Sequence, residues 1–162
     1  MRYSGVIAVG ERQRGRAPRV LVLEDDDDLR VLIAETLRTD GFEVIETGEG
    51  IALDELLEAE GLDQDPHDPP FDLVVCDLLL PNRSGIDVLE DMQQAGWSVP
   101  IVVVTGVHDM AMQNHARKLG AAAVFHKPFE VDDLRMAVLN LMPASIEQDP
   151  ASRRHAIPVS PH

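Results

Sequence analysis

Residues 19–47, RVLVLEDDDDLRVLIAETLRTDGFEVIET, contain the pattern that decides the fold. The run RVLVL at 19–23 is apolar after its first residue and has the length of a buried strand. Across 28–39 apolar side chains recur at helical spacing, Gly41 follows, and FEVIET at 42–47 has the composition of a second strand. The stretch therefore predicts a strand, a helix and another strand, the opening of a βαβ unit.

The same alternation continues through the rest of the apolar sequence. We expect strands at 71–77, 100–105 and 121–126, and helices at 51–60, 85–96, 110–120 and 130–142. The first, third and fourth strands are apolar rather than alternating, which is typical of the middle of a parallel sheet with helices on both faces. The sequence therefore predicts an α/β fold with a doubly wound five-stranded parallel sheet, from about Arg19 to Met142.

Length and composition indicate one domain. The chain has 162 residues, and its 44% hydrophobic content is enough for an ordinary apolar core. We place the domain at 18–143 and expect disordered tails at 1–17, which carries several arginines, and at 144–162, which is rich in Pro and Ser. The segment GLDQDPHDPP at 61–70 is too rich in Pro and Asp for a helix and predicts an acidic surface loop.

The net charge limits the classes of partner. A formal charge of -15 argues against nucleic acid or an anionic membrane surface and favours protein partners or cations. No apolar run approaches membrane-spanning length, and the N-terminus does not look like a secretory signal, so we expect a cytoplasmic protein. The single cysteine, Cys76, excludes an internal disulfide and is expected to be a small core residue rather than a reactive thiol.

Polar side chains stand at the carboxyl ends of the predicted strands. They are Glu24, Asp25, Asp77, Thr105 and Lys127. Parallel strands bring their carboxyl ends to one edge of a sheet, where doubly wound folds bind ligands, so we expect these side chains to lie together. Three carboxylates, a hydroxyl and an ammonium provide oxygen ligands for Mg²⁺, a carboxylate nucleophile and two groups that can hold phosphoryl oxygens.

Part of this acidic cluster has a simpler interpretation. Asp is common at helix N-termini, so Asp27 or Asp28 could serve only as a cap, and Glu24 and Asp25 could be solvated turn residues. Asp77 is different, because it stands between two apolar segments and no helix begins for several residues. It is therefore the strongest candidate for a functional carboxylate.

Four segments carry a resemblance to a known family. They are VLEDDDDLR at 22–30, DLVVCDLLLPNRSGIDVL at 72–89, IVVVTG at 101–106 and FHKPF at 125–129. Together they resemble the receiver domain of two-component response regulators, over about residues 18–142. The resemblance implies a flavodoxin-like sheet of order 2-1-3-4-5 and a switch protein rather than an enzyme. Asp77 would be the phosphoacceptor, with a histidine kinase or a phosphotransfer protein as the donor.

The resemblance also implies roles for the groups around Asp77. Asp25 and Asp77 would ligate Mg²⁺ directly, together with the main-chain carbonyl of Leu79. Glu24 would act largely through metal-bound water. Lys127 would pair with Asp77 and, after transfer, with the phosphoryl group.

Three further features follow from the resemblance, and one departs from it. Thr105 would bond a phosphoryl oxygen, Gly85 would serve the turn into the next helix, and the peptide bond before Pro128 would be cis. Where the family usually has Tyr or Phe in the last strand, this chain has Val124. Phe125 is one residue along and should face the other way. The usual coupling between hydroxyl and aromatic residue is therefore in question.

The resemblance implies output through protein contact. In this family partners exchange on the face formed by the last strand and its flanking helices, here 110–120, 121–126 and 130–142. We expect a stand-alone receiver that binds a downstream protein there, with a homodimer left open. In this family polar side chains two residues after the phosphoacceptor and two after the hydroxyl residue can orient the water that hydrolyses the acyl phosphate. By this resemblance those positions are Leu79 and Val107 here, which cannot bond a water, so slow self-dephosphorylation is expected.

Three alternative functions stay open. A pseudo-receiver would bind partners without phosphorylation. A Mg²⁺-dependent phosphatase would also use an Asp nucleophile, but its usual second acid two residues later is replaced here by Leu79. A nucleotide binder of the same fold would need a phosphate-binding loop where the acidic residues 24–28 would repel phosphate.

Two other groups of residues were considered as functional sites. His108, His115 and His126 are on separate predicted elements without metal-ligand spacing, so a histidine metal site is not expected. Met110 and Met112 belong to one predicted helix and fit either the core or an exposed partner face.

Overall fold

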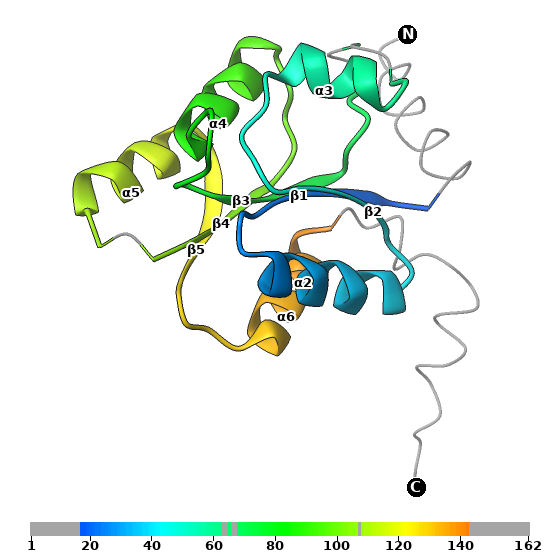
Figure 1. The fold of residues 1–162 in the computed structure, drawn as a ribbon. Coiled ribbons are helices and arrows are strands. Elements are labelled where there is room, and N and C mark those ends of the chain that lie inside the picture. The colour runs from blue at the N-terminus through cyan, green and yellow to red at the C-terminus, as the bar shows by residue number, and fades with distance from the viewer. Residues whose placement is uncertain (1–16, 63–64, 66–67, 107, 143–162) are drawn as a thin grey trace, which may run out of the picture.

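The computed structural model describes residues 17–62, 65, 68–106 and 108–142. Its centre is a five-stranded parallel sheet of order β2-β1-β3-β4-β5, which confirms the predicted topology (Figure 1). The strands are β1 (Arg19–Leu23), β2 (Glu43–Thr47), β3 (Leu73–Asp77), β4 (Ile101–Thr105) and β5 (Ala121–His126). From β1 the chain crosses over to β2 on one side, and from β3 it crosses over to β4 on the other side. The direction in which strands are added to the sheet therefore changes between β1 and β3, which are neighbours.

Helices cover both faces of the sheet. Figure 1 shows α3, α4 and α5 on one face and α2 and α6 on the other. Their bounds are α2 (Asp27–Thr39), α3 (Leu53–Ala59), α4 (Gly85–Gln94), α5 (Met110–Lys118) and α6 (Val131–Leu141). The prediction of five strands alternating with five helices is therefore confirmed for the described residues.

The core consists of two apolar clusters, one on each side of the sheet. Successive side chains of β3 alternate between them, with Val74 and Cys76 in the cluster under α3, α4 and α5, and Leu73 and Val75 in the other. Every residue of β3 and β4 is buried. The continuous apolar runs predicted this, because a strand covered on both faces has no solvent side. The edge strand β5 is only half-buried.

The first helix begins one residue earlier than the sequence suggested. Asp26 is its N-cap, with extended backbone, and its carboxylate accepts a hydrogen bond from the backbone N–H of Leu29 at 3.1 Å. Asp27 and Asp28 lie in the first turn, where negative charge is favourable beside the helix N-terminus. The interpretation of Asp27 or Asp28 as the cap was therefore wrong, because Asp26 occupies that position.

The turn from β3 into α4 is tight enough to require glycine. A Cβ atom at Gly85 would lie 2.1 Å from the carbonyl oxygen of Asp77, and the Gly85 N–H donates to the carbonyl of Leu78 at 2.9 Å. Ser84 and Asp87 then close a reciprocal capping box at the start of α4. The expected role of Gly85 in this turn has a direct steric cause.

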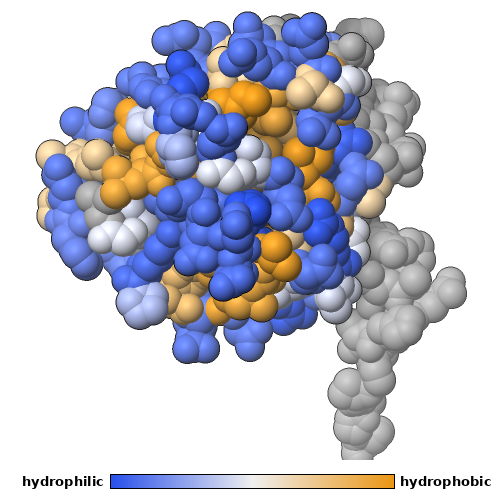
Figure 2. Space-filling model, viewed as in Figure 1, coloured by the Kyte–Doolittle hydropathy of each residue, from blue (hydrophilic) through white to orange (hydrophobic). Residues whose placement is uncertain are grey.

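The surface of the domain is mostly polar. Figure 2 shows a largely hydrophilic face on which apolar residues form separate patches. Among the described residues, no helix is long and apolar enough to cross a membrane. The tails expected at 1–17 and 144–162 lie outside the described residues apart from Ala17, and so do residues 63, 64, 66 and 67 of the predicted acidic loop.

Replacing Gly85 is expected to destabilise the domain. In Gly85→Ala the new methyl group meets backbone atoms, which cannot move aside as a flexible side chain would, so we expect a loss of about 2–3 kcal/mol in the free energy of unfolding. Gly106→Ala is the matched control, because a Cβ there meets nothing within 4 Å. Urea unfolding followed by circular dichroism measures both. Equal stabilities of the two variants would contradict this account of the turn.

Candidate functional site

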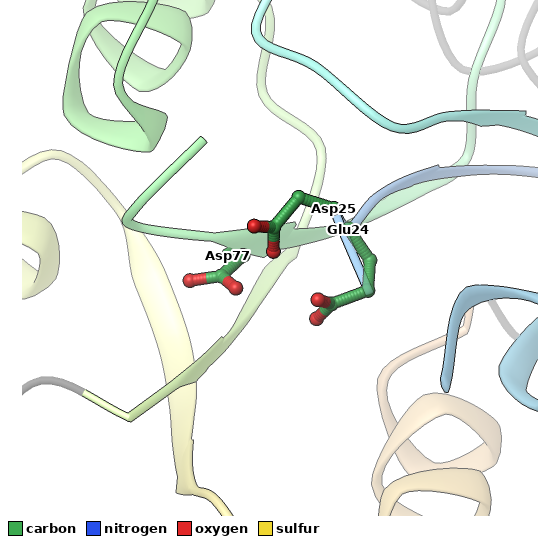
Figure 3. Close-up of side chains that lie close together, drawn as sticks. All are labelled: Glu24, Asp25 and Asp77. Carbon is green, nitrogen blue, oxygen red and sulfur yellow. The ribbon is translucent and has the colours of Figure 1, made fainter. Parts of the chain in front are cut away.

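Three carboxylates meet where β1 and β3 end. Leu23 pairs with Cys76 in the parallel register, so the next residues on the two strands, Glu24 and Asp77, are neighbours. One carboxylate oxygen each from Glu24, Asp25 and Asp77 lie within 4.8 Å of one another. Figure 3 shows the three side chains extending from these two strand ends around a shared space. Glu24 and Asp77 are buried and Asp25 is exposed, so this space opens to solvent on one side.

Lys127 joins two of these carboxylates. Its Nζ lies 2.7 Å from Oδ2 of Asp77 and 2.9 Å from Oε2 of Glu24. The peptide bond between Lys127 and Pro128 is cis, as expected. Burial opposes the lysine's charge, but hydrogen bonds to Asp77 and Glu24 outweigh this effect and raise the pKa of the ammonium group. The lysine therefore stays protonated and offsets part of the negative charge.

Glu24 is the most unusual acid of the group. Its side chain is fully buried, and burial raises its pKa to about 7. The charge of Asp77 adds to this rise, whereas the Asp26 N–H and Lys127, both bonded to Oε2, reduce it. The other oxygen, Oε1, is buried without a hydrogen-bond partner in the described part of the chain. A buried acceptor beside two more carboxylates is a suitable environment for a cation.

Asp77 receives hydrogen bonds on both of its oxygens. Oδ1 accepts the backbone N–H of Leu79 at 2.9 Å, while Oδ2 faces Lys127. The side chain of Leu79 itself is 55% exposed. Thr105 is buried at the end of β4, and its carbonyl accepts the Lys127 N–H at 2.9 Å. The structure thus brings Glu24, Asp25, Asp77 and Lys127 into one cluster and places Leu79 and Thr105 at the same edge of the sheet.

The loop after Asp77 is tied to the loop after β2. Arg83 donates to both carboxylate oxygens of Asp91 at 2.9 Å, and Asp91 accepts the N–H of Leu53 at the start of α3. The Gly50 N–H also donates to the carbonyl of Pro81 at 2.9 Å. Sequence analysis missed these residues, because the contacts join three separate elements. The tight approach at Gly50, where a Cβ would lie 1.8 Å from the Arg83 carbonyl oxygen, also has no local sequence signal.

Val124 and Phe125 lie on opposite faces of β5, as predicted. Val124 packs against the cluster under α3, α4 and α5. Phe125 packs on the other side, with its ring 5.7 Å from that of Phe129. Phe125 therefore does not replace the missing aromatic side chain at position 124.

Two other sequence questions receive answers. Met112 packs against the core, whereas Met110 is 60% exposed, so the two methionines have different roles. The rings of His108 and His126 stack in parallel at 6.0 Å, although the sequence placed them on separate elements. Within the described residues the acidic cluster is nevertheless the only group of three or more potential metal ligands, so no histidine metal site is found there.

Comparison with known proteins identifies the family. Residues 20–139 match the model of the response regulator receiver domain. The chain belongs to this family. Receivers are phosphoacceptor switches of two-component signalling, and the acidic cluster at the end of β3 is the corresponding pocket of this receiver. Membership favours this class over the phosphatase and the nucleotide binder considered from the sequence.

Individual relatives support the assignment. Sporulation initiation phosphotransferase F of Bacillus subtilis is 26% identical over 125 residues, which cover 77% of this chain and 94% of that protein. The transcriptional regulatory protein PdtaR of Mycobacterium tuberculosis is 37% identical over 121 residues, covering 74% of this chain and 54% of PdtaR. This receiver therefore corresponds to about half of that regulator.

Solved structures agree with the fold. The non-phosphorylated HemR receiver domain of Leptospira biflexa superimposes with a TM-score of 0.64 and 30% sequence identity. The match covers 76% of this chain and 93% of the HemR domain.

The raised pKa of Glu24 predicts a pH effect on stability. The pKa of Glu24 is ordinarily 4.5 and is raised to about 7 in the folded state. At pH values between these two, the folded state keeps a proton on Glu24 that the unfolded state has lost. Without metal, the stability of the receiver relative to Glu24→Gln should therefore fall as pH rises through this window, by an amount on the order of 1 kcal/mol. Urea unfolding of both proteins in chelator, from pH 5 to pH 8, measures the difference. A difference independent of pH would show that Glu24 titrates normally.

Proposed function

We propose that Asp77 accepts a phosphoryl group from a histidine kinase or a phosphotransfer protein and that the receiver signals through the resulting change in protein contacts. The observation that carries this proposal is the position of Lys127, whose ammonium group lies between Asp77 and the buried Glu24. A lysine placed there partly neutralises the acceptor and can follow the charge onto an incoming phosphoryl group.

The transfer itself requires little covalent chemistry from the protein. An oxygen of Asp77 forms a bond to phosphorus while the P–N bond of the donor phosphohistidine breaks, and the imidazole leaves with the electron pair of that bond. Lys127 then exchanges its contact with Oδ2 of Asp77 for one with a phosphoryl oxygen. Thr105, at the end of the adjacent strand β4, donates its hydroxyl hydrogen to another phosphoryl oxygen.

The acidic cluster is suited to Mg²⁺. Asp25, Asp77 and the main-chain carbonyl of Leu79 would hold the ion, and Glu24 would act through metal-bound water. The unpartnered buried oxygen of Glu24 and the clustered carboxylate oxygens fit a hard divalent cation. When bound, Mg²⁺ supplies positive charge that attracts the phosphoryl oxygens to Asp77.

The proposed output face consists of α5, β5 and α6. The edge strand β5 is only half-buried, and Met110 on α5 and Met136 on α6 are 60% and 51% exposed. These side chains offer apolar contact to a downstream protein or to a second copy of the chain. A stand-alone receiver is supported by the similarity to sporulation initiation phosphotransferase F, of which the match covers 94%.

Phosphorylation by a small donor tests the proposal. Incubating the full chain with Mg²⁺ and acetyl phosphate should add the mass of one phosphoryl group, because no kinase is needed to position this donor. Asp77→Asn should abolish the addition, since an amide is a poor nucleophile, whereas the exposed Asp54→Asn should not. Mg²⁺ should also raise the melting temperature, and Asp25→Ala should reduce that rise. Unmodified wild-type protein would favour the alternative of a pseudo-receiver.

The phosphorylated state is expected to decay slowly. Leu79 lies directly beside Asp77, and its exposed apolar side chain cannot orient an attacking water. Val107, the second residue expected to influence hydrolysis, lies outside the described residues. Combining Leu79→Asn with Val107→Glu should accelerate decay about tenfold or more, whereas the exposed Val31→Asn on α2 should not. Mass spectrometry after removal of the donor follows the decay. Loss within seconds in the wild type would refute slow hydrolysis.

A further inference from the structure

The main chain at Glu24 is fixed by hydrogen bonds on both sides. Its N–H donates to the carbonyl of Thr47 on β2 at 3.1 Å. Its own carbonyl accepts Nη1 of Arg30 at 3.0 Å. Because a peptide unit is planar, the direction of the Glu24 carbonyl also sets the position of the Asp25 N–H and Cα. The bond from Arg30 therefore influences where the Asp25 side chain leaves the backbone.

Arg30 is itself held in place by its other nitrogens. Nε lies 3.3 Å from Glu46 on β2, and Nη2 lies 2.8 Å from Asp27 at the start of α2. The Arg30 side chain is only 17% exposed. It thus links β2, α2 and the end of β1 through three different donors, which suits the rigid fork geometry of arginine.

The charge of Arg30 does not explain its position. A fixed positive charge near a cation site disfavours binding, but Glu46 and Asp27 offset the charge of this guanidinium. Asp27 is 82% exposed, so its ion pair with Arg30 contributes little to stability. The contact that reaches the site is the hydrogen bond to the Glu24 carbonyl, which indicates a geometric role.

Gly48 leaves the space that this contact needs. A Cβ at position 48 would lie 2.8 Å from Nη1 of Arg30 and 3.8 Å from the carbonyl oxygen of Glu24. The backbone of Gly48 is not in the left-handed region, so alanine is compatible with its conformation. Gly48→Ala therefore displaces the guanidinium without altering Arg30, and it gives an independent way to disturb the same hydrogen bond.

We propose that Arg30 is a positioning residue for the cation site: its hydrogen bond to the Glu24 carbonyl orients the Glu24–Asp25 peptide so that the Asp25 carboxylate remains beside Asp77. Arg30 is not a ligand and acts through the backbone. This inference rests on the proposed function, because it assumes that the cluster binds Mg²⁺.

The test compares Mg²⁺ affinity among full-length variants by isothermal titration calorimetry. Arg30→Leu and Gly48→Ala should each weaken Mg²⁺ binding about tenfold, as the loss of residues that orient ligands does at other metal sites. Arg30→Lys should recover part of the loss, because one ammonium donor can still reach toward the Glu24 carbonyl. The matched control is the double variant Asp27→Asn, Glu46→Gln, which removes the charges paired with Arg30, and with them the Arg38–Glu46 ion pair. Its amide oxygens can still accept hydrogen bonds from the guanidinium and hold it against the Glu24 carbonyl. It should change the affinity less than about twofold at 0.15 M salt, a concentration at which exposed charges are screened.

The outcomes separate the two proposals. Melting temperatures in chelator identify any variant that fails to fold, and Gly48→Ala then provides the decisive comparison. If the wild type binds Mg²⁺ and is phosphorylated but Arg30→Leu and Gly48→Ala bind equally well, the positioning role is wrong and the proposed function stands. If the ion-pair double variant loses as much affinity as Arg30→Leu, the role is electrostatic and the inference fails. A wild type that binds no Mg²⁺ overturns both.

Discussion

The contact of one ammonium group with two buried carboxylates constrains the whole active edge of this receiver. Glu24 and Asp77 come from adjacent strands and would repel each other if both were charged and alone. Lys127 reaches them from the end of β5, two strands away from β3. This requires β5 to pair with β4 in a register that brings Lys127 next to Thr105, where its N–H bonds the Thr105 carbonyl. The strand order and the charge balance therefore depend on each other.

Some side chains of the site extend from rigid strands, and others lie on segments that can move. Glu24 and Asp77 extend from buried strands whose positions are fixed by two apolar clusters. The groups expected to respond to phosphorylation lie at strand ends or in loops, where fewer apolar contacts hold the chain. The loop after Asp77 is an intermediate case, because Arg83 and Asp91 connect it to the start of α3. Movement of the proposed acceptor, Asp77, can therefore be transmitted to α3 as well as to the proposed output face.

The sequence predicted the features that depend on local pattern and topology. Apolar runs located the strands, and helical periods located the helices. Because parallel strands end at one edge of a sheet, the sequence also predicted that Asp77, Glu24 and Lys127 lie together. The helix cap was misplaced because successive Asp residues have the same capping chemistry. The choice of Asp26 depends on the backbone angles and on a hydrogen bond from its N–H to Glu24.

Specific side-chain contacts between elements, away from the carboxyl ends of the strands, could not be predicted from the sequence pattern. Arg30 is on α2 and Glu46 is on β2, sixteen residues apart, and only the packing of this helix beside the sheet brings them together. The stacking of His108 on His126 likewise depends on the pairing of β4 with β5. No periodicity encodes such contacts, because each side chain alone is compatible with an exposed position. Long-range pairs of this kind require the fold before they can be assigned.

The only cysteine of the chain gives the receiver a built-in chemical reporter. Cys76 is fully buried in β3, its thiol lies 3.2 Å from the main-chain carbonyl of Asp77, and burial raises the pKa of the thiol. Alkylating reagents react with the thiolate, and in the folded strand this thiol is both inaccessible and protonated. It therefore reacts only when the strand opens locally. The rate of alkylation of the unmodified protein therefore measures how often the centre of the sheet opens immediately beside Asp77, the proposed phosphoacceptor, without any engineered label.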